Sequence, residues 1–457
     1  MSRVVYSGVS NVVWSILLII FLVIGLAIGY MIPRPGVVSV ATQTQTITVP
    51  GPGGATITMP VTITAPGAVS GLPKEIPIGV LDALSGAFAS FGIRGQTAAK
   101  LAEKDINDFV NRLGLGVRFV FYYEDFAGKP DVALQKLQIL AARGVKVIIG
   151  GIFSAAAKQM APYADANKIV VIASASTVPR EEVAPAGDYV FRTLPTTEAE
   201  GAALGMLMKE LGIKNVIMVT PEEICMLAFR KAYLDIARKV GINVALDLTY
   251  PYGTKDFNPI LDQMEKAAKP YIDRGEPYVV IANVWEDEAV QLLNQAKMRN
   301  SPLLNTIWFT SDAVPMSTVV LQQAGDIANK IKLIGTLFTG AASKVYDHVR
   351  DYMKSVLGQE PDIYALAEYD SAWIAALAIL LAGKYDGEAI KNALPLAAKI
   401  YWGATGNIEF NEKGDRAYAD VAFYAVINKE WRVIGVYKVL ENKVSWILSP
   451  QEILKIS

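Results

Sequence analysis

The sequence predicts an α/β protein in which two Rossmann-like lobes each carry a parallel sheet covered by helices. The first observation is that short apolar runs alternate with longer amphipathic segments from Ile76 onward. The second is that this alternation occurs as two consecutive series, and a span of about 380 residues is long for one domain. The third is the hydrophobic fraction, 52% of 457 residues, which is enough for more than one core.

The first series predicts a set of strands at 76–82, 117–125, 145–149, 169–172 and 189–192, with amphipathic helices at 94–114 and 130–144. The second series predicts strands at 215–220, 243–250, 278–284, 306–312 and 331–338, with helices at 198–212, 224–241, 257–273 and 286–298. Repeated strand–helix units favour parallel sheets, because each helix crosses a face of the sheet before the next strand begins. A ligand is then expected between the lobes, where strand ends face each other.

The last part of the globular region predicts a helix at 361–383 followed by antiparallel strands around the turn 411–415. The helix is apolar enough to span a membrane. Asp362, Glu368 and Asp370 interrupt it, however, so a buried core helix is the better interpretation.

Composition excludes several classes of protein. The formal charge is −1, from 43 basic and 44 acidic residues, and no basic block indicates a nucleic-acid partner. The single cysteine, Cys225, allows no intramolecular disulfide. With one histidine besides, no Cys/His metal site can contain more than one ligand of each kind, and no metal or cofactor is predicted. That histidine, His348, lies in a charged amphipathic stretch typical of a helix surface.

Residues 1–34 are predicted to be a membrane anchor. The stretch 11–31 is nearly all apolar, and at helical rise it spans roughly 30 Å, the thickness of a bilayer core. A cleaved signal peptide is the alternative, although the apolar core is long for one. The domain that follows is expected outside the cell or in the periplasm.

Residues 35–74 are rich in Thr, Pro and Gly, a composition that predicts an extended linker. Its threonines are possible sites of O-glycosylation. The Thr-x-Thr alternation would suit a strand, but Pro50, Pro52, Pro60 and Pro66 interrupt it. Such a stalk would hold a globular domain near the membrane surface.

Hydroxyl side chains follow two successive strands, which suggests a site for a small anion. Ser154 opens a helical pattern after the run 145–149, and Ser174, Ser176 and Thr177 follow the run 169–172. In a parallel sheet these strand ends share one edge, and a helix start offers free N–H groups to an anion such as a carboxylate. The plain alternative is that Ser154 caps a helix and Thr177 only ends a strand.

Several motifs in order resemble one family: IPIGVLDALSGAFASFG (76–92), VIIGGIFS (147–154), IASAST (172–177), YVFRTLPTTEAEGAAL (189–204), YPYGTKDF (250–257), YALAEYDSAW (364–373) and GNIEFNEKGDRA (406–417). The chain over roughly 75–440 is similar to the extracellular solute-binding proteins of branched-chain amino acid ABC transporters, the leucine/isoleucine/valine-binding type of periplasmic binding protein fold I. The resemblance implies two lobes that close on a ligand and three crossovers, near Arg192-Thr193, Gly335-Thr336 and Gly406-Asn407. Lobe 1 would be 75–193 with 337–406, and lobe 2 would be 194–336 with 407–440, leaving 441–457 as a tail.

The resemblance also implies a set of ligand contacts. Ser154 and Thr177, with Ala175 in the same loop, match the positions that hold an α-carboxylate, and Asp312 matches the acid that holds an α-ammonium. Asp312 could instead be a turn or capping residue. Phe91 matches a pocket aromatic, and the remaining expected wall residues are Ser85, Phe88, Phe153 and Trp285.

One segment departs from the family pattern. In PEEICMLAF (221–229) Cys225 stands where an aromatic is usual, and Met226 and Ala228 stand where glycines are usual. The ligand is therefore left open beyond an amino acid or a related compound.

The sequence favours a non-enzymatic function: capture of an amino acid outside the cell and delivery to membrane permease subunits of an ABC transporter. A membrane-anchored sensor of amino acids or amides is the second possibility. A hydrolase is the third, but no nucleophile–base pair and no glycine-rich phosphate loop is evident.

Overall fold

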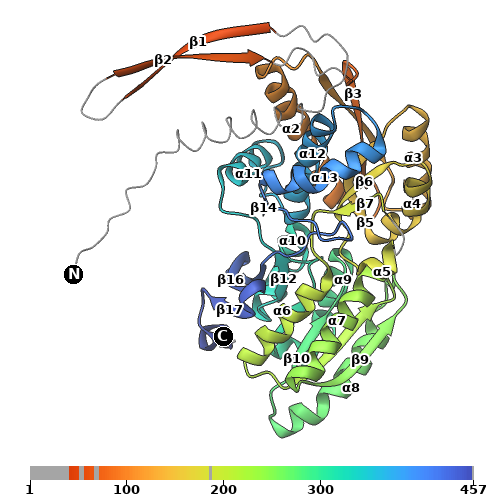
Figure 1. The fold of residues 1–457 in the computed structure, drawn as a ribbon. Coiled ribbons are helices and arrows are strands. Elements are labelled where there is room, and N and C mark those ends of the chain that lie inside the picture. The colour runs from red at the N-terminus through yellow and green to blue at the C-terminus, as the bar shows by residue number, and fades with distance from the viewer. Residues whose placement is uncertain (1–40, 51–55, 66–70, 185–187, 455–457) are drawn as a thin grey trace. The chain divides into compact units, whose positions relative to one another are not determined.

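The computed structural model describes residues 41–50, 56–65, 71–184 and 188–454 (Figure 1). The expected membrane anchor at 1–34 lies outside these residues. The described chain forms two units, which we treat separately. One contains a β-hairpin, and the other contains Leu72–Phe109 and the chain from Val117 onward, which includes both lobes.

The hairpin corrects the expectation of an extended linker at 35–74. Strand β1 (Ala41–Pro50) pairs antiparallel with β2 (Thr56–Ala65), and the register runs from Ala41 opposite Ala65 to Pro50 opposite Thr56. Thr, Ile and Val favour strands, and Pro50 falls at a strand end. Pro60 lies inside β2, which a two-stranded ribbon tolerates because both of its strands are edges.

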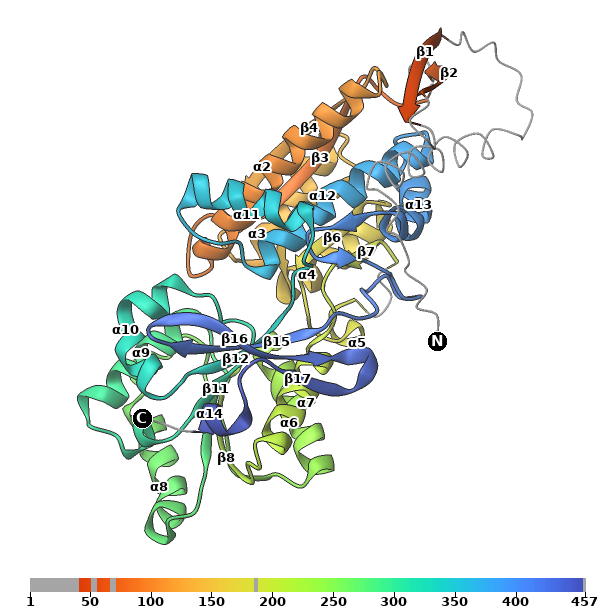
Figure 2. The same ribbon diagram turned by 90° about the vertical axis from the view of Figure 1, so that its left-hand side faces the viewer.

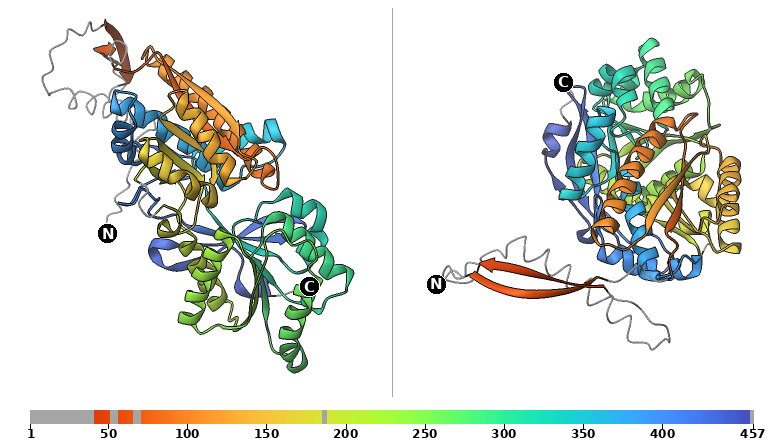
Figure 3. Two further views of the ribbon diagram at one scale, coloured as in Figure 1. Left: turned by 90° about the vertical axis from the view of Figure 1, so that its right-hand side faces the viewer. Right: turned by 90° about the horizontal axis from the view of Figure 1, so that it is seen from above.

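The first lobe is built on a five-stranded parallel sheet. Its order is β4-β3-β5-β6-β7, with β3 Glu75–Asp82, β4 Arg118–Asp125, β5 Val147–Phe153, β6 Val170–Ala175 and β7 Val190–Arg192. Its helices are α2 Ala89–Arg112, α3 Pro130–Ala142, α4 Ser154–Ala166, α5 Arg180–Val183, α11 Lys344–Leu357, α12 Ile363–Ala382 and α13 Gly387–Ile400. The blue helices α12 and α13 thus share a lobe with the orange and yellow elements from much earlier in the chain (Figure 3).

Helix α12 is a core element of this lobe, as predicted for 361–383. Within the described residues it is the one helix long and apolar enough to cross a membrane. It packs against β5 and β6, and its acidic residues Glu368 and Asp370 are completely buried.

The second lobe is built on a mixed eight-stranded sheet of order β17-β16-β15-β12-β11-β10-β8-β9. Strands β8 Asn215–Pro221, β9 Asn243–Tyr250, β10 Val279–Ala282, β11 Trp308–Thr310 and β12 Ile334–Phe338 are parallel, whereas β15 Val421–Ile427, β16 Glu430–Lys438 and β17 Lys443–Trp446 continue the sheet antiparallel. Figure 2 shows the C-terminal strands beside β12. The segment 441–457, expected as a tail, therefore supplies β17, because β16 has a free edge that β17 covers.

The helices of the second lobe follow its parallel strands. They are α6 Thr197–Glu210, α7 Ile224–Val240, α8 Asn258–Arg274, α9 Glu286–Met298, α10 Thr318–Lys330 and the short α14 Pro450–Leu454, with 3-10 turns η2 Pro302–Asn305 and η3 Val439–Glu441. Helices α7 and α8 end at Gly241 and Gly275, both in the left-handed conformation that glycine adopts without strain.

Three segments connect the lobes: 193–196, 339–343 and 408–420. The last follows a small hairpin of β13 (Trp402–Gly403) and β14 (Gly406–Asn407). The second crossover lies later than the position expected near Gly335-Thr336, because β12 pairs with β15 as far as Phe338.

Hydrogen bonds tie these crossovers to one another. The Arg416 guanidinium donates to Thr193 O at 3.3 Å and to Thr405 Oγ1 at 2.9 Å. The Thr339 amide donates to Asp420 O at 3.0 Å, which ties the middle crossover to the third. A buried carboxylate, Asp415, accepts from Arg192 Nε at 2.7 Å. The three connecting segments therefore form one hydrogen-bonded hinge region.

Candidate functional site

The segment from β5 to α4 places Ser154 at the predicted sheet edge. Gly150 has φ +139°, and a Cβ there would lie 2.1 Å from Leu81 O on the neighbouring strand β3. Only glycine allows this close approach. Three residues after Gly151, Ser154 begins α4 with its side chain completely buried.

The loop after β6 folds over the start of α4. Ser154 Oγ lies 3.1 Å from Ser176 Oγ and accepts a hydrogen bond from the Val178 amide at 3.3 Å. Ala175 and Thr177 are buried in the same loop, and Thr177 O accepts from the Thr197 amide at 2.7 Å. Because Thr197 begins α6, this bond joins the loop to the second lobe.

A second polar group comes from the end of β11. Asp312 is buried, and its Oδ2 accepts from the Tyr364 hydroxyl at 2.5 Å. Burial raises the pKa of Asp312 to about 6, and the bond from Tyr364 opposes this rise. Tyr364 lies on α12, so this hydrogen bond crosses from one lobe to the other.

Cys225 is close to both polar groups. It is buried at the start of α7, where the Glu223 carboxylate caps the helix by accepting from the Cys225 amide at 2.9 Å. Burial raises the pKa of the thiol, and both Ser154 and Asp312 are near enough to influence it. Ser154, Cys225 and Asp312 therefore share one buried neighbourhood formed by both lobes.

Aromatic rings form an apolar wall beside these groups. The ring centroids of Phe88 and Phe153 are 4.6 Å apart, and those of Phe88 and Trp285 are 4.8 Å apart. Phe91 packs edge-on against Phe153 at 6.3 Å and against Tyr364 at 5.8 Å. The wall continues a hydrophobic cluster that includes Trp285 from the second lobe, so the lobes contact each other here.

A polar contact also joins the lobes beside this wall. Ser90 Oγ donates to Glu286 Oε1 at 3.1 Å, from α2 to α9. Together with the Tyr364–Asp312 bond, it flanks the aromatic rings.

Ser85 is the predicted site residue that does not join this group. It is exposed, and its hydroxyl donates to Asp125 Oδ2 at 2.7 Å. Asp125 also accepts from the Leu84 amide at 2.8 Å, so Ser85 belongs to a turn held by that carboxylate.

Tyr364 and Glu200 are polar groups near Asp312 to which the sequence assigned no role, and Met226 is an apolar one. Tyr364 and Glu200 lie in the motifs 364–373 and 189–204, which carry the family resemblance. Their separation along the chain from Asp312 left no local pattern linking them to it. Met226 Sδ lies 3.6 Å from Ser311 Oγ, next to Asp312.

A buried pair of acids supports the segment that leads to Ser154. Asp82, at the end of β3, accepts from the Gly151 amide at 3.0 Å. A Cβ on Gly95 would lie 2.3 Å from Glu368 Oε2 and 3.2 Å from Asp82 Oδ1, which shows how close the two carboxyls are. Burial raises the pKa of Asp82 to about 7 and raises that of Glu368 as well.

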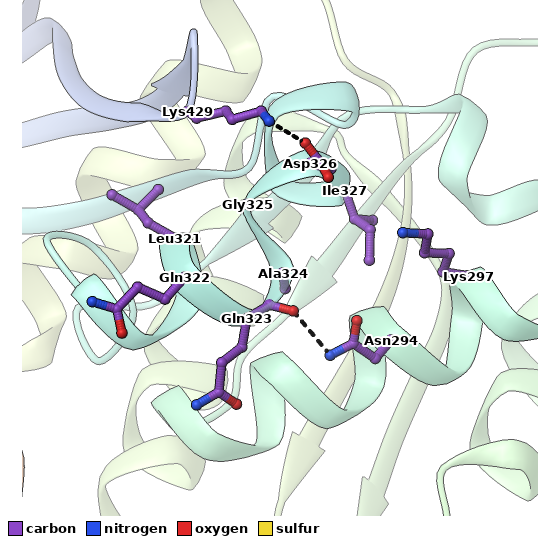
Figure 4. A pocket seen from close by; sticks show the side chains of 10 residues that line it. All are labelled: Asn294, Lys297, Leu321, Gln322, Gln323, Ala324, Gly325, Asp326, Ile327 and Lys429. Carbon is purple, nitrogen blue, oxygen red and sulfur yellow. Dashed lines mark hydrogen bonds and ion pairs between the residues drawn. The ribbon is translucent and has the colours of Figure 1, made fainter.

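A separate surface pocket of about 170 Å³ lies between α9 and α10. Figure 4 shows its lining, where Lys429 pairs with Asp326 at 2.5 Å and the Asn294 amide donates to Gln323 O at 3.3 Å. The predicted site residues do not line it. This pocket is formed by the second lobe alone, whereas the groups around Asp312 come from both lobes, so we take the latter as the candidate site.

Comparison with known proteins places these observations in a family. Residues 75–430 match the family described as periplasmic binding protein. An uncharacterized protein of Methanocaldococcus jannaschii is 30% identical over 409 residues, covering 86% of this chain and 96% of that protein. The leucine-, isoleucine-, valine-, threonine- and alanine-binding protein of Pseudomonas aeruginosa is 24% identical over 356 residues, covering 76% of this chain and 89% of that protein.

The fold has a solved counterpart. The crystal structure of a leucine-binding protein from Thermotoga maritima matches with a TM-score of 0.69 at 20% identity, covering 79% of this chain and 98% of that one. The predicted α/β architecture with parallel sheets is thereby confirmed.

Proposed function

Because this chain belongs to the periplasmic binding protein family, we propose that it is the substrate-binding subunit of an ABC transporter and captures an amino acid outside the cell. The similarity to amino acid-binding proteins such as the one from Pseudomonas aeruginosa supports this substrate class. The observation that carries the proposal is the meeting of Ser154, Cys225 and Asp312 in one buried neighbourhood made by two lobes.

The chemistry of these groups suits the two ends of a zwitterion. The Ser154 and Thr177 hydroxyls and the free amides at the start of α4 would hold the carboxylate. Asp312, with the Tyr364 hydroxyl beside it, would hold the ammonium through a charge-assisted hydrogen bond. The rings of Phe91, Phe153 and Trp285 would cover an apolar side chain.

Binding in this scheme is coupled to lobe closure. A ligand would bind one lobe first and gain contacts from the other as the lobes close, so that it shifts the population toward the closed form. Cys225 and Met226 occupy the space where the family pattern has an aromatic and a glycine. The volume left beside them would set which side chain fits.

The experiment that tests capture is a thermal-shift screen of the full-length protein in detergent against the twenty amino acids. A ligand at a hundred times its Kd adds about 2.7 kcal/mol to the free energy of unfolding, which gives a measurable rise in melting temperature. Native mass spectrometry would then weigh the bound ligand. The proposal is refuted if no amino acid raises the melting temperature or appears in the spectrum.

Delivery to permease subunits and retention at the membrane belong to the same proposal. The apolar stretch 11–31 would anchor the chain, with the globular domain outside the cell. Membrane fractions washed with alkaline carbonate should retain the protein. Release into the wash, or a chain shortened by cleavage after this stretch, would show that the segment is a signal peptide instead.

We also propose that binding involves no chemical change of the ligand, because the family consists of binding proteins. Incubation of the protein with a bound amino acid should return the ligand unaltered by chromatography. Steady formation of a product that depends on Asp312 would overturn this.

A further inference from the structure

Glu200 is a buried acid whose charge has no evident partner. It lies in the first turns of α6, and its side chain is completely buried. Among the described residues, neither of its carboxylate oxygens has a hydrogen-bond partner. A buried carboxyl without a partner is costly, so its presence calls for an explanation in terms of something that it binds.

The surroundings of Glu200 place it at the candidate site. It is close enough to Asp312 for that carboxyl to raise its pKa, and its own charge helps to raise the pKa of Tyr364. The helix that carries it is bonded to the carboxylate-side loop through the Thr197 amide and Thr177 O. Thr197 Oγ1 is likewise buried without a partner among the described residues, so unused polar atoms cluster at this end of α6.

The electrostatics of this corner favour a cation. Burial raises the pKa of Glu200, and the neighbouring Asp312 raises it further. No cation among the described residues lowers the pKa of Glu200 or of Asp312. Glu200, Asp312 and the Tyr364 hydroxyl therefore lie within electrostatic range of one another, and Tyr364 and Asp312 are joined by a hydrogen bond.

We infer that Glu200 is a second acidic ligand-binding group, which holds the ammonium of the bound molecule together with Asp312. This rests on the proposed function of the site. A primary ammonium has three N–H donors, and Glu200, Asp312 and the Tyr364 oxygen supply three acceptors from α6, β11 and α12. A site with two carboxyls selects strongly for molecules that carry an amino group over the same molecules without it.

The test compares Glu200→Gln with Glu198→Gln in the full-length protein. Glu198 lies two residues away on the same helix, is exposed, and accepts from Thr196 Oγ1 at 3.1 Å, so it controls for the loss of one charge. Three probes are titrated by calorimetry: leucine, 4-methylpentanoate, which lacks the amino group, and 3-methylbutylamine, which lacks the carboxylate.

We expect Glu200→Gln to weaken binding of the two ammonium probes about tenfold or more, as for a hydrogen bond to a charged group, and to leave 4-methylpentanoate unchanged. Glu198→Gln should leave all three unchanged. Glu200→Met, which removes the polar group at similar volume, should give the same selective loss and serves if the Gln variant does not fold.

Two results with the variant overturn the inference. In one, Glu200→Gln binds the ammonium probes as the wild type does; in the other, it weakens binding of all three probes equally, as a structural role would. Absence of any ammonium-probe binding to the wild type overturns it too. Failure of the proposed function looks different, because leucine and the other amino acids then do not bind while 3-methylbutylamine still responds to Glu200→Gln.

Discussion

The buried acid Asp82 makes the stability of the protein depend on pH in a direction that can be worked out. Its pKa rises from the ordinary 3.8 to about 7, mainly because the side chain is completely buried. Between pH 4 and pH 7 the folded protein therefore keeps a proton that the unfolded chain releases. The stability of the folded protein is then greatest below the pKa that Asp82 has in the unfolded chain, and it falls as the pH rises through the pKa that Asp82 has in the folded protein.

The size of this effect follows from the difference between the two pKa values. A rise from 3.8 to about 7 corresponds to a loss of stability on the order of 4 kcal/mol between pH 4 and pH 8, in which Glu368 shares because the two buried carboxyls titrate together. Asp82→Asn removes this titration. The Asn oxygen can still accept from the Gly151 amide, so the support for the segment leading to Ser154 is kept.

The assay is urea unfolding of wild type and Asp82→Asn at half-unit steps from pH 4 to pH 8, with Glu412→Gln as an exposed control. We expect the stability of Asp82→Asn relative to the wild type to rise by about 4 kcal/mol across this range, while the control runs parallel to the wild type. Parallel profiles for Asp82→Asn and wild type would refute the reasoning, since Asp82 would then not carry the proton.

Three further predictions concern the hinge, the backbone and the site. Asp415→Ala should destabilise the protein by about 3–5 kcal/mol in urea, because it leaves the buried Arg192 charge unpaired; a loss below 1 kcal/mol would contradict this. Gly150→Ala should lower stability by about 2 kcal/mol or more through the clash with a strand carbonyl, whereas Gly144→Ala, also at positive φ but facing open space, should cost only about 1 kcal/mol; equal losses would remove the case for close packing. Asp312→Asn should weaken amino acid binding by about 2 kcal/mol in calorimetry, or about thirtyfold, and an unchanged Kd would exclude Asp312 from the site.

The elements that the sequence predicted well are those whose signals are local. The helix expected at 286–298 is α9 Glu286–Met298, and the helix expected at 361–383 is α12 Ile363–Ala382. Helix α9 has an apolar period, α12 is apolar on nearly all sides, and each is long enough to be recognised. Gly241 and Gly383 stop their helices in the left-handed conformation, which is a one-residue signal.

Features that depend on distant pairing were harder to foresee. The hairpin at 41–65 has a strand-like threonine alternation, but its prolines outweighed that pattern until the pairing of the two strands was known. Strand β17 was missed because its four residues are stabilised by the edge of β16 more than by their own composition.

The candidate site was likewise predictable only in part. Ser154, Thr177 and Asp312 stand at strand ends, where position along the chain is informative. Tyr364 and Glu200 lie on helices of different lobes, and a hydrogen bond such as that from Tyr364 to Asp312 forms between residues that only the fold brings together. Ser85 also follows a strand, but its hydroxyl is bonded to Asp125 at the end of the neighbouring strand β4, a partner that its position along the chain did not indicate.

The ties between the three crossovers restrict how the protein can open. Because Arg416 is bonded to Thr193 and the Thr339 amide to Asp420 O, none of the three connecting segments can slide along the others without breaking these bonds. The motion that remains is a rotation of one lobe relative to the other about an axis near this cluster. A small swing at this axis separates Tyr364 from Asp312 and Ser90 from Glu286 at once, so that access for a solute is gained or lost in a single cooperative step.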